Sequence, residues 1–74
     1  MEYNEEKVDE MVLALLYLGL HGESRSWKGF DWDALNRLHA KELIGNPVGK
    51  AKSVYLTEKG LEMSKNLFEK HFSK

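Results

Sequence analysis

The sequence predicts one small α+β domain over residues 1–74, mostly helical with one two-stranded β-hairpin. Apolar residues recur at helical spacing in three segments, and a polar tip separates two short β-prone runs. A chain of 74 residues is long enough for one core only. It has no cysteine to crosslink that core, so association with a second copy is the stabilising device we expect.

The first helix is expected from about Asn4 to Gly19. Asn4 suits the N-cap, and acidic residues fill the first turn, where the helix dipole favours them. Its second half is apolar on more than one face, which predicts burial in the core or against a second copy. The main apolar stripe consists of Val8, Met11, Val12, Leu15 and Leu18.

The second helix is expected over 33–43, with Asp31 or Asp33 as its N-cap. Gly45 is placed to end this helix, and Pro47 prevents its continuation. The interval 21–28 before it, rich in glycine and serine, is expected to be a polar connection. The aromatic residues that follow, Trp27, Phe30 and Trp32, are expected to fold over the core as a short strand or turn.

The hairpin is expected to form a wing near 47–57, with strands at 47–48 and 53–56 around the tip at 49–52. Thr57 is the expected N-cap of a last helix over 58–72. The side chains expected in the core are Trp27, Phe30, Leu35, Leu38, Ile44, Val54, Leu56, Leu61 and Phe68.

The order of these motifs resembles winged-helix regulators of the MarR and PadR kind. The residues that carry the resemblance are the run LNRLHAKELI, the basic wing, and the run YLTEKGL. The resemblance implies a winged helix-turn-helix fold and a DNA-binding, transcription-regulating function. This chain departs from the pattern twice: Glu42 replaces a glycine, which moves the expected helix end to Gly45, and about a dozen residues separate Leu20 from Asp33, too few for a full middle helix.

The whole chain also resembles a small uncharacterised bacterial family with the core motifs WKGFDWDALNRLH and KAKSVYLTEKG. That resemblance implies no function.

The resemblance places candidate DNA contacts on the second helix and on the wing. Asn and Arg, with His, can contact base edges, and Lys can hold phosphate, so double-stranded DNA is the expected partner. The alternative is a solvated helix face and a solvated turn. Asp31 and Asp33 count against contact because they repel phosphate. The candidates are Asn36, Arg37, His39 and Lys41 on the helix, and Lys50 and Lys52 on the wing.

Charge is distributed unevenly along the chain. The formal net charge is −1, yet residues 1–24 carry −5 and residues 25–59 carry +3. This division predicts two faces with different partners. It favours DNA binding, while the overall charge favours the alternative function, a winged helix that contacts another protein.

Catalytic and metal-binding motifs are not found. The three histidines lack carboxylate or thiolate partners at ligand spacing, and no serine stands in a nucleophile motif. We therefore expect no enzyme activity, no metal and no cofactor. Trp27, Phe30 and Trp32 have two interpretations, stacking on bases and packing in the core, and aromatic residues at this spacing favour the core.

The apolar run Met11–Leu20 is about half the length that a membrane span needs, and its acidic flank is unlike a signal peptide. A cytoplasmic location is expected, in keeping with the lack of cysteine. The surplus apolar surface of Leu13–Leu20 and of the last helix predicts a homodimer with an isologous contact.

Overall fold

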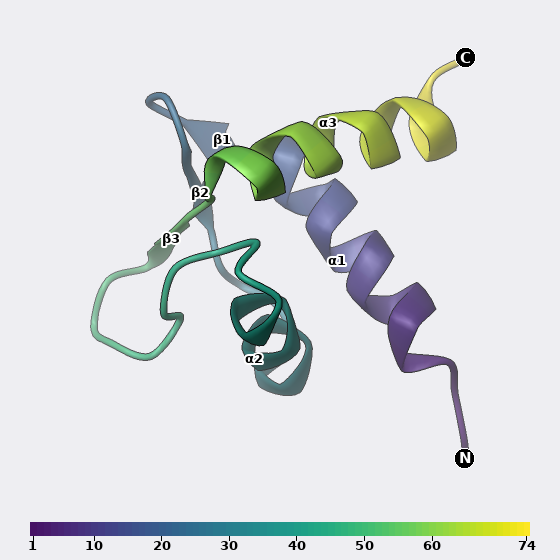
Figure 1. The fold of residues 1–74 in the computed structure, drawn as a ribbon, viewed down its shortest axis with the longest axis horizontal. Coiled ribbons are helices and arrows are strands. Elements are labelled where there is room, and N and C mark those ends of the chain that lie inside the picture. Colours follow the sequence, from purple (N-terminus) through teal and green to yellow (C-terminus); the bar gives the residue numbers. More distant parts are fainter.

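The computed structural model describes residues 1–74 as three helices and a three-stranded antiparallel sheet (Figure 1). The α+β class and the helical majority predicted from the sequence are confirmed, but the sheet has three strands and not two. In chain order the elements are α1 (Glu5–Leu18), β1 (Leu20–His21), β2 (Arg25–Trp27), α2 (Trp32–Ala40), β3 (Ser53–Tyr55) and α3 (Glu58–Phe72).

Helix α3 lies across α1, and α2 packs on the same helix nearer its N-terminus (Figure 1). The ring centroids of Tyr17 and Phe68 are 5.4 Å apart, and that of Phe72 lies 5.2 Å beyond Phe68. Much of the apolar surface predicted to pair two copies is therefore covered within one chain. The buried core consists of Val12, Leu13, Leu16, Ala34, Leu35, Leu38, Leu43, Ile44, Val54 and Leu56.

The sheet has the order β1-β2-β3, and the interval 21–28 predicted as a connection contains all of β2 and the second residue of β1. Gly22, with φ 65°, turns the chain between β1 and β2. Ser26 faces inward and its hydroxyl donates to the Leu16 carbonyl at 2.6 Å. The strand escaped prediction because its one buried side chain is a small polar residue, so the apolar alternation that marks a strand is missing.

The predicted wing strand at Pro47–Val48 is wrong. Strand β3 pairs with β2 on one side, and on the other it meets Ile44 and Gly45: Ile44 bridges Leu56, and the Gly45 amide donates to the Tyr55 carbonyl at 2.7 Å. Proline has no amide hydrogen to donate to a neighbouring strand, and the 46–52 segment leaves the sheet as a loop.

Helix α2 ends at Ala40, earlier than predicted, and Gly45 does not cap it. The Glu42 amide donates to the His39 carbonyl at 2.9 Å and the Leu43 amide donates to the Leu38 carbonyl at 3.1 Å. Glu42 has φ 61°, the left-handed conformation that closes such a C-terminal motif. The helix thus ends where the resembled pattern has its glycine, although a glutamate stands there.

Thr57 caps α3 as predicted and also ties α3 to the end of α2. Its hydroxyl accepts from the Gly60 amide at 3.0 Å and donates to the Glu42 carbonyl at 2.8 Å. A Cβ on Gly60 would collide with the carbonyl oxygen of Leu43. In the run LTEKG, the threonine therefore caps α3 and the glycine leaves room for the Leu43 backbone against which α3 packs.

An ion pair joins α1 to α2. The Asp9 side chain is 3% exposed and accepts from Arg37 Nε at 2.8 Å and from Nη2 at 2.8 Å. Arg37 Nη1 also lies 3.0 Å from a carboxylate oxygen of Glu5. The hydrogen bonds that Arg37 donates to Asp9, aided by the charges of Asp9 and Glu5, raise the pKa of Arg37 above its usual value.

Five of the nine side chains predicted in the core are buried, namely Leu35, Leu38, Ile44, Val54 and Leu56. Phe30, Leu61 and Phe68 are half-buried. Trp27 is 56% exposed, so its predicted burial is wrong. Strand alternation explains this error, since Ser26 takes the inward position and its neighbours must point outward.

Replacing Glu42 by glycine should stabilise the fold by about 0.5–1 kcal/mol, since glycine adopts positive φ without a Cβ penalty. Urea unfolding measures the gain. The control is Glu42→Ala, which removes the same charge from the helix C-terminus and keeps a Cβ. An equal gain in both variants would assign the effect to charge and not to backbone conformation.

Replacing Arg37 by methionine should destabilise the fold, because it leaves the buried Asp9 carboxylate with only Lys41 Nζ, 3.8 Å away. The double variant Asp9→Asn/Arg37→Met carries no unpaired charge and should unfold at a higher temperature than Arg37→Met alone. Thermal unfolding followed by circular dichroism compares them. A double variant no more stable than the single one would contradict this role of the pair.

Candidate nucleic-acid interface

The four residues predicted to contact DNA from the second helix point in different directions. Asn36 is exposed to solvent. Arg37 and Lys41 both turn toward Asp9 on α1, with Lys41 Nζ 3.8 Å from the carboxylate. His39 Nδ1 lies 3.1 Å from the Ile44 carbonyl, a contact that requires the proton on Nδ1 because a carbonyl only accepts.

Helix α2 therefore presents no unpaired cation to solvent. Its exposed side chains are Trp32, Asp33, Asn36, His39 and Ala40. No helix lies between α1 and α2; β1 and β2 fill that interval, so the first helix of a helix-turn-helix unit is absent. A helix that enters the major groove needs partners for the flanking phosphates, and here the cations on α2 face acidic side chains of the same molecule.

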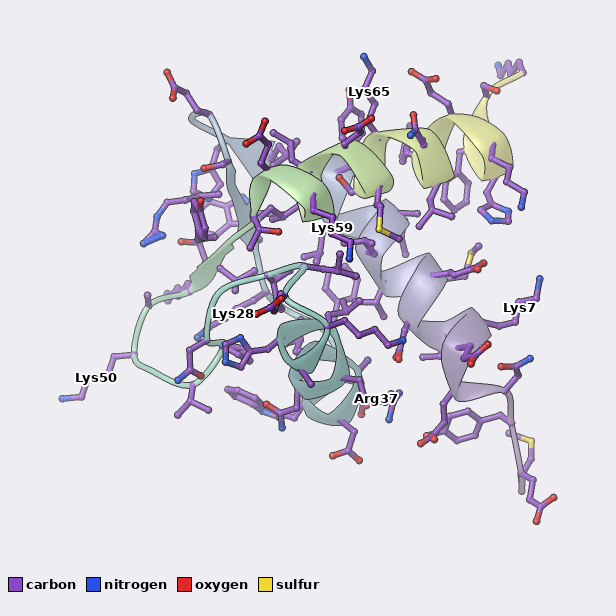
Figure 2. The ribbon with its side chains drawn as sticks, in the orientation of Figure 1. Lys7, Lys28, Arg37, Lys50, Lys59 and Lys65 are labelled. Carbon is purple, nitrogen blue, oxygen red and sulfur yellow. The ribbon has the colours of Figure 1, made fainter.

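The two lysines predicted at the wing, Lys50 and Lys52, are exposed on the 46–52 loop. Figure 2 shows Lys50 pointing away from the body of the molecule. Lys28 holds the base of the loop, since its Nζ donates to the Pro47 carbonyl at 2.6 Å and to the Gly49 carbonyl at 3.2 Å. The loop thus carries two free lysines on a backbone tethered by a third.

The outer face of the sheet lies next to this loop and carries aromatic and basic side chains. Arg25 and Trp27 point outward from β2, and Tyr55 points outward from β3. Trp27 is 56% exposed and Tyr55 is 48% exposed. We call this face, with the adjoining lysines, the sheet surface: Arg25, Trp27, Lys28, Lys50, Lys52 and Tyr55.

No acidic side chain neutralises the sheet surface. Residues 24–30 and 43–57, which supply all of its members, contain no Asp or Glu. The only basic residues that take part in ion pairs are Arg37, Lys41 and His71, none of which belongs to the sheet surface. Four acidic residues flank these segments directly. Glu23 and Glu58 line a separate hollow beside α3, the Asp31 side chain caps α2 by accepting from the Ala34 amide, and Glu42 follows the end of α2. The sheet surface is therefore a cationic patch with exposed aromatic rings.

Sequence reasoning found Lys50 and Lys52 but missed Arg25 and Tyr55, and it placed Trp27 in the core. The pattern of two large side chains, Arg25 and Trp27, on either side of the small Ser26 was the signal that could have indicated an outward-facing strand. Trp32, also predicted to cover the core, is 55% exposed and lies outside the sheet surface, between Asp31 and Asp33. Lys28 Nζ is 5.7 Å from the centre of its ring.

An apolar hollow of about 370 Å³ opens beside the sheet surface. Leu18, which is 69% exposed, forms part of its wall, and Trp27 lines it as well. The lining residues are Leu15, Leu18, Gly19, Trp27, Gly29 and Phe30. No group of three or more His, Asp or Glu side chains is placed to hold a metal ion, and no helix is long and apolar enough to cross a membrane.

Comparison with known proteins places the chain in a family but gives it no function. The "Uncharacterized protein y4hR" of Sinorhizobium fredii (strain NBRC 101917 / NGR234) is 51% identical over 74 residues, which is the full length of both chains. No solved structure matches. Residues 4–74 match the family model described as "Domain of unknown function (DUF6429)". The chain therefore belongs to the DUF6429 family.

Proposed function

We propose that this protein binds nucleic acid through the sheet surface. The observation that carries the proposal is the gathering of Arg25, Lys28, Lys50 and Lys52 on the sheet and its adjoining loop, without a single acidic residue in the segments that supply them. Nucleic-acid phosphates bind such a face by releasing condensed counterions, and the −1 net charge of the chain does not prevent this when the charges are segregated.

Acidic residues elsewhere support the same assignment. They neutralise the cations of α2 through Asp9 and Glu5, and they leave those of the sheet surface unpaired. A surface evolved only for solubility has both signs interspersed. The side of the molecule suited to phosphate is therefore the sheet and its loop, and the predicted contacts of Arg37 and Lys41 are not part of the proposal.

We propose that the fold is related to the winged helix and lacks the helix that normally lies between the first helix and the recognition helix. Strand β3 lies between β2 and the Ile44–Gly45 segment, and the 46–52 loop connects that segment to β3. That order of neighbours is the one expected for a wing on a three-stranded sheet. A reduced winged helix of this kind would contact nucleic acid with its wing and would lack a recognition helix, so a role as transcription regulator would rest on the wing.

A second candidate function is association with another protein chain, and the apolar hollow favours it. Leu18 is among the most exposed large apolar side chains, and the hollow it borders contains no charged residue. The occupant we propose is a second copy, because a 74-residue chain without disulfides gains most from burying such a surface. The contact would be smaller than predicted from sequence, since α3 covers much of α1.

Binding to nucleic acid should appear at low salt and weaken steeply as salt rises. Lys28 is held by loop carbonyls, so the free cations are Arg25, Lys50 and Lys52, and three contacts with phosphate give a log–log salt slope of about −2 to −3. Fluorescence anisotropy of a labelled oligonucleotide at about 50 mM salt measures it, with protein up to about 100 μM, which covers the usual range for non-specific complexes. Absence of binding there would remove the proposal.

The double variant Lys50→Ala/Lys52→Ala should reduce the magnitude of this slope by about 1.4 to 1.8. The matched control is Lys65→Ala/Lys70→Ala, which removes the same charge from α3. Figure 2 shows Lys65 on the far side of α3 from the loop. Equal effects of the two pairs would mean that binding depends on net charge and not on the sheet surface.

If the hollow is a homodimer contact, the chain should sediment as a dimer at high micromolar concentration. Leu18→Glu should then yield a monomer, because it places a charge in an apolar contact. Val48→Glu is the matched control, since Val48 is equally exposed at 69% and lies on the loop. A wild-type monomer at that concentration would exclude the second candidate.

A further inference from the structure

We infer that the ligand of the sheet surface is single-stranded nucleic acid, whose unpaired bases stack on Trp27 and Tyr55. This inference rests on the proposed function and names its substrate class. Two large aromatic rings stand half-exposed on a sheet that no other layer covers (Figure 1). Burial in the core does not account for their position.

The register of the sheet keeps both rings accessible. Trp27 lies opposite Ser53, a side chain too small to cover an indole. The His21 ring packs against one side of the indole, with 4.4 Å between centroids, and Trp27 remains 56% exposed on the rest of its surface. Tyr55 lies opposite Arg25 and packs against Gly45, which has no side chain to cover it. Two aromatic rings on one sheet face, with Arg25 exposed on the same face, form a platform for successive bases.

Base stacking on protein rings requires bases that are not already stacked in a duplex. Inside a double helix each base has a neighbour on both faces, so Trp27 and Tyr55 would gain nothing from duplex beyond phosphate contacts. The element that would enter a duplex groove, α2, has its cations turned to Asp9. Arg25, Lys50 and Lys52 remain free to follow a flexible phosphate backbone along the platform.

Trp32 provides an internal control. It is 55% exposed, almost the same as Trp27, but it lies between Asp31 and Asp33, whose carboxylates repel phosphate. Solvent exposure is thus matched. Lys28 Nζ lies 5.7 Å from the centre of the Trp32 ring, but only Trp27 stands on the sheet itself, on the same strand as Arg25 and beside the strand of Tyr55. If stacking depends on the sheet surface, only Trp27 should respond to a single strand.

The experiment uses the two single-tryptophan variants of the full chain, Trp32→Leu and Trp27→Leu, with their folding checked by circular dichroism. Oligothymidylate should quench the fluorescence of Trp27 in the first variant and leave Trp32 in the second unchanged. Its affinity should exceed that of a duplex of equal length. Trp27→Leu should weaken oligothymidylate binding about 5- to 100-fold with the salt slope unchanged, because no charge is lost.

Each other outcome is informative as well. Duplex bound as tightly as the single strand, with Trp27 unquenched, would overturn the inference and leave the proposed function standing. Absence of binding to either ligand at about 50 mM salt would overturn both. If Trp27→Leu fails to fold, Trp32→Leu still reports quenching of Trp27, and Tyr55→Val tests the second ring with a side chain suited to a strand.

Discussion

The close approach of α3 to the end of α2 is the constraint on which the rest of the structure depends. Gly60 lies against the Leu43 carbonyl with no room for a Cβ, and Thr57 binds the backbone on either side of that contact. Because this junction fixes where α3 begins, it also fixes how α3 crosses α1 and where β3 ends. The core, the sheet and the outward face of β3 all follow from one helix start.

The charged residues have different roles on the two sides of this molecule. On the α1–α2 side, the buried Asp9 and the flanking Glu5 hold Arg37 in place, so opposite charges serve the packing of two helices. On the sheet side, cations stand without acidic partners and an ordinary solvated surface would not separate them so completely. Glu5 and Asp9 in the acidic start of the sequence thus serve helix packing, and the basic middle supplies cations that have no acidic partner.

Prediction from the sequence succeeded where the signal was local. The apolar periodicity and the cap residues Asn4 and Thr57 defined α1 and α3 to within one residue, because caps and stripes are encoded within a few positions. Strand β2 was not predicted because its inward residue is the small polar Ser26, which gives no apolar signal. The end of α2 was predicted wrongly because Glu42 adopts a left-handed backbone conformation, which glutamate rarely does.

The candidate site was predictable only in part, for a similar reason. Lys50 and Lys52 were found because a polar loop tip is exposed in almost any arrangement of the chain. Arg37 looked equally available, since helical spacing gives the face of a residue but not its partner, and Asp9 is 28 positions away. Trp27 was misplaced because composition treats an aromatic residue as core unless the strand that turns it outward is known.

The crossing of α1 by α3 also has a consequence for synthesis of the chain. The α1 surface that includes Tyr17 is made first and covered last, since about 40 residues separate Leu18 from Glu58. At about 5–20 residues per second, a ribosome needs roughly 2–8 s to make that interval. Until α3 is complete, the apolar face of α1 that includes Tyr17 has no cover within the chain.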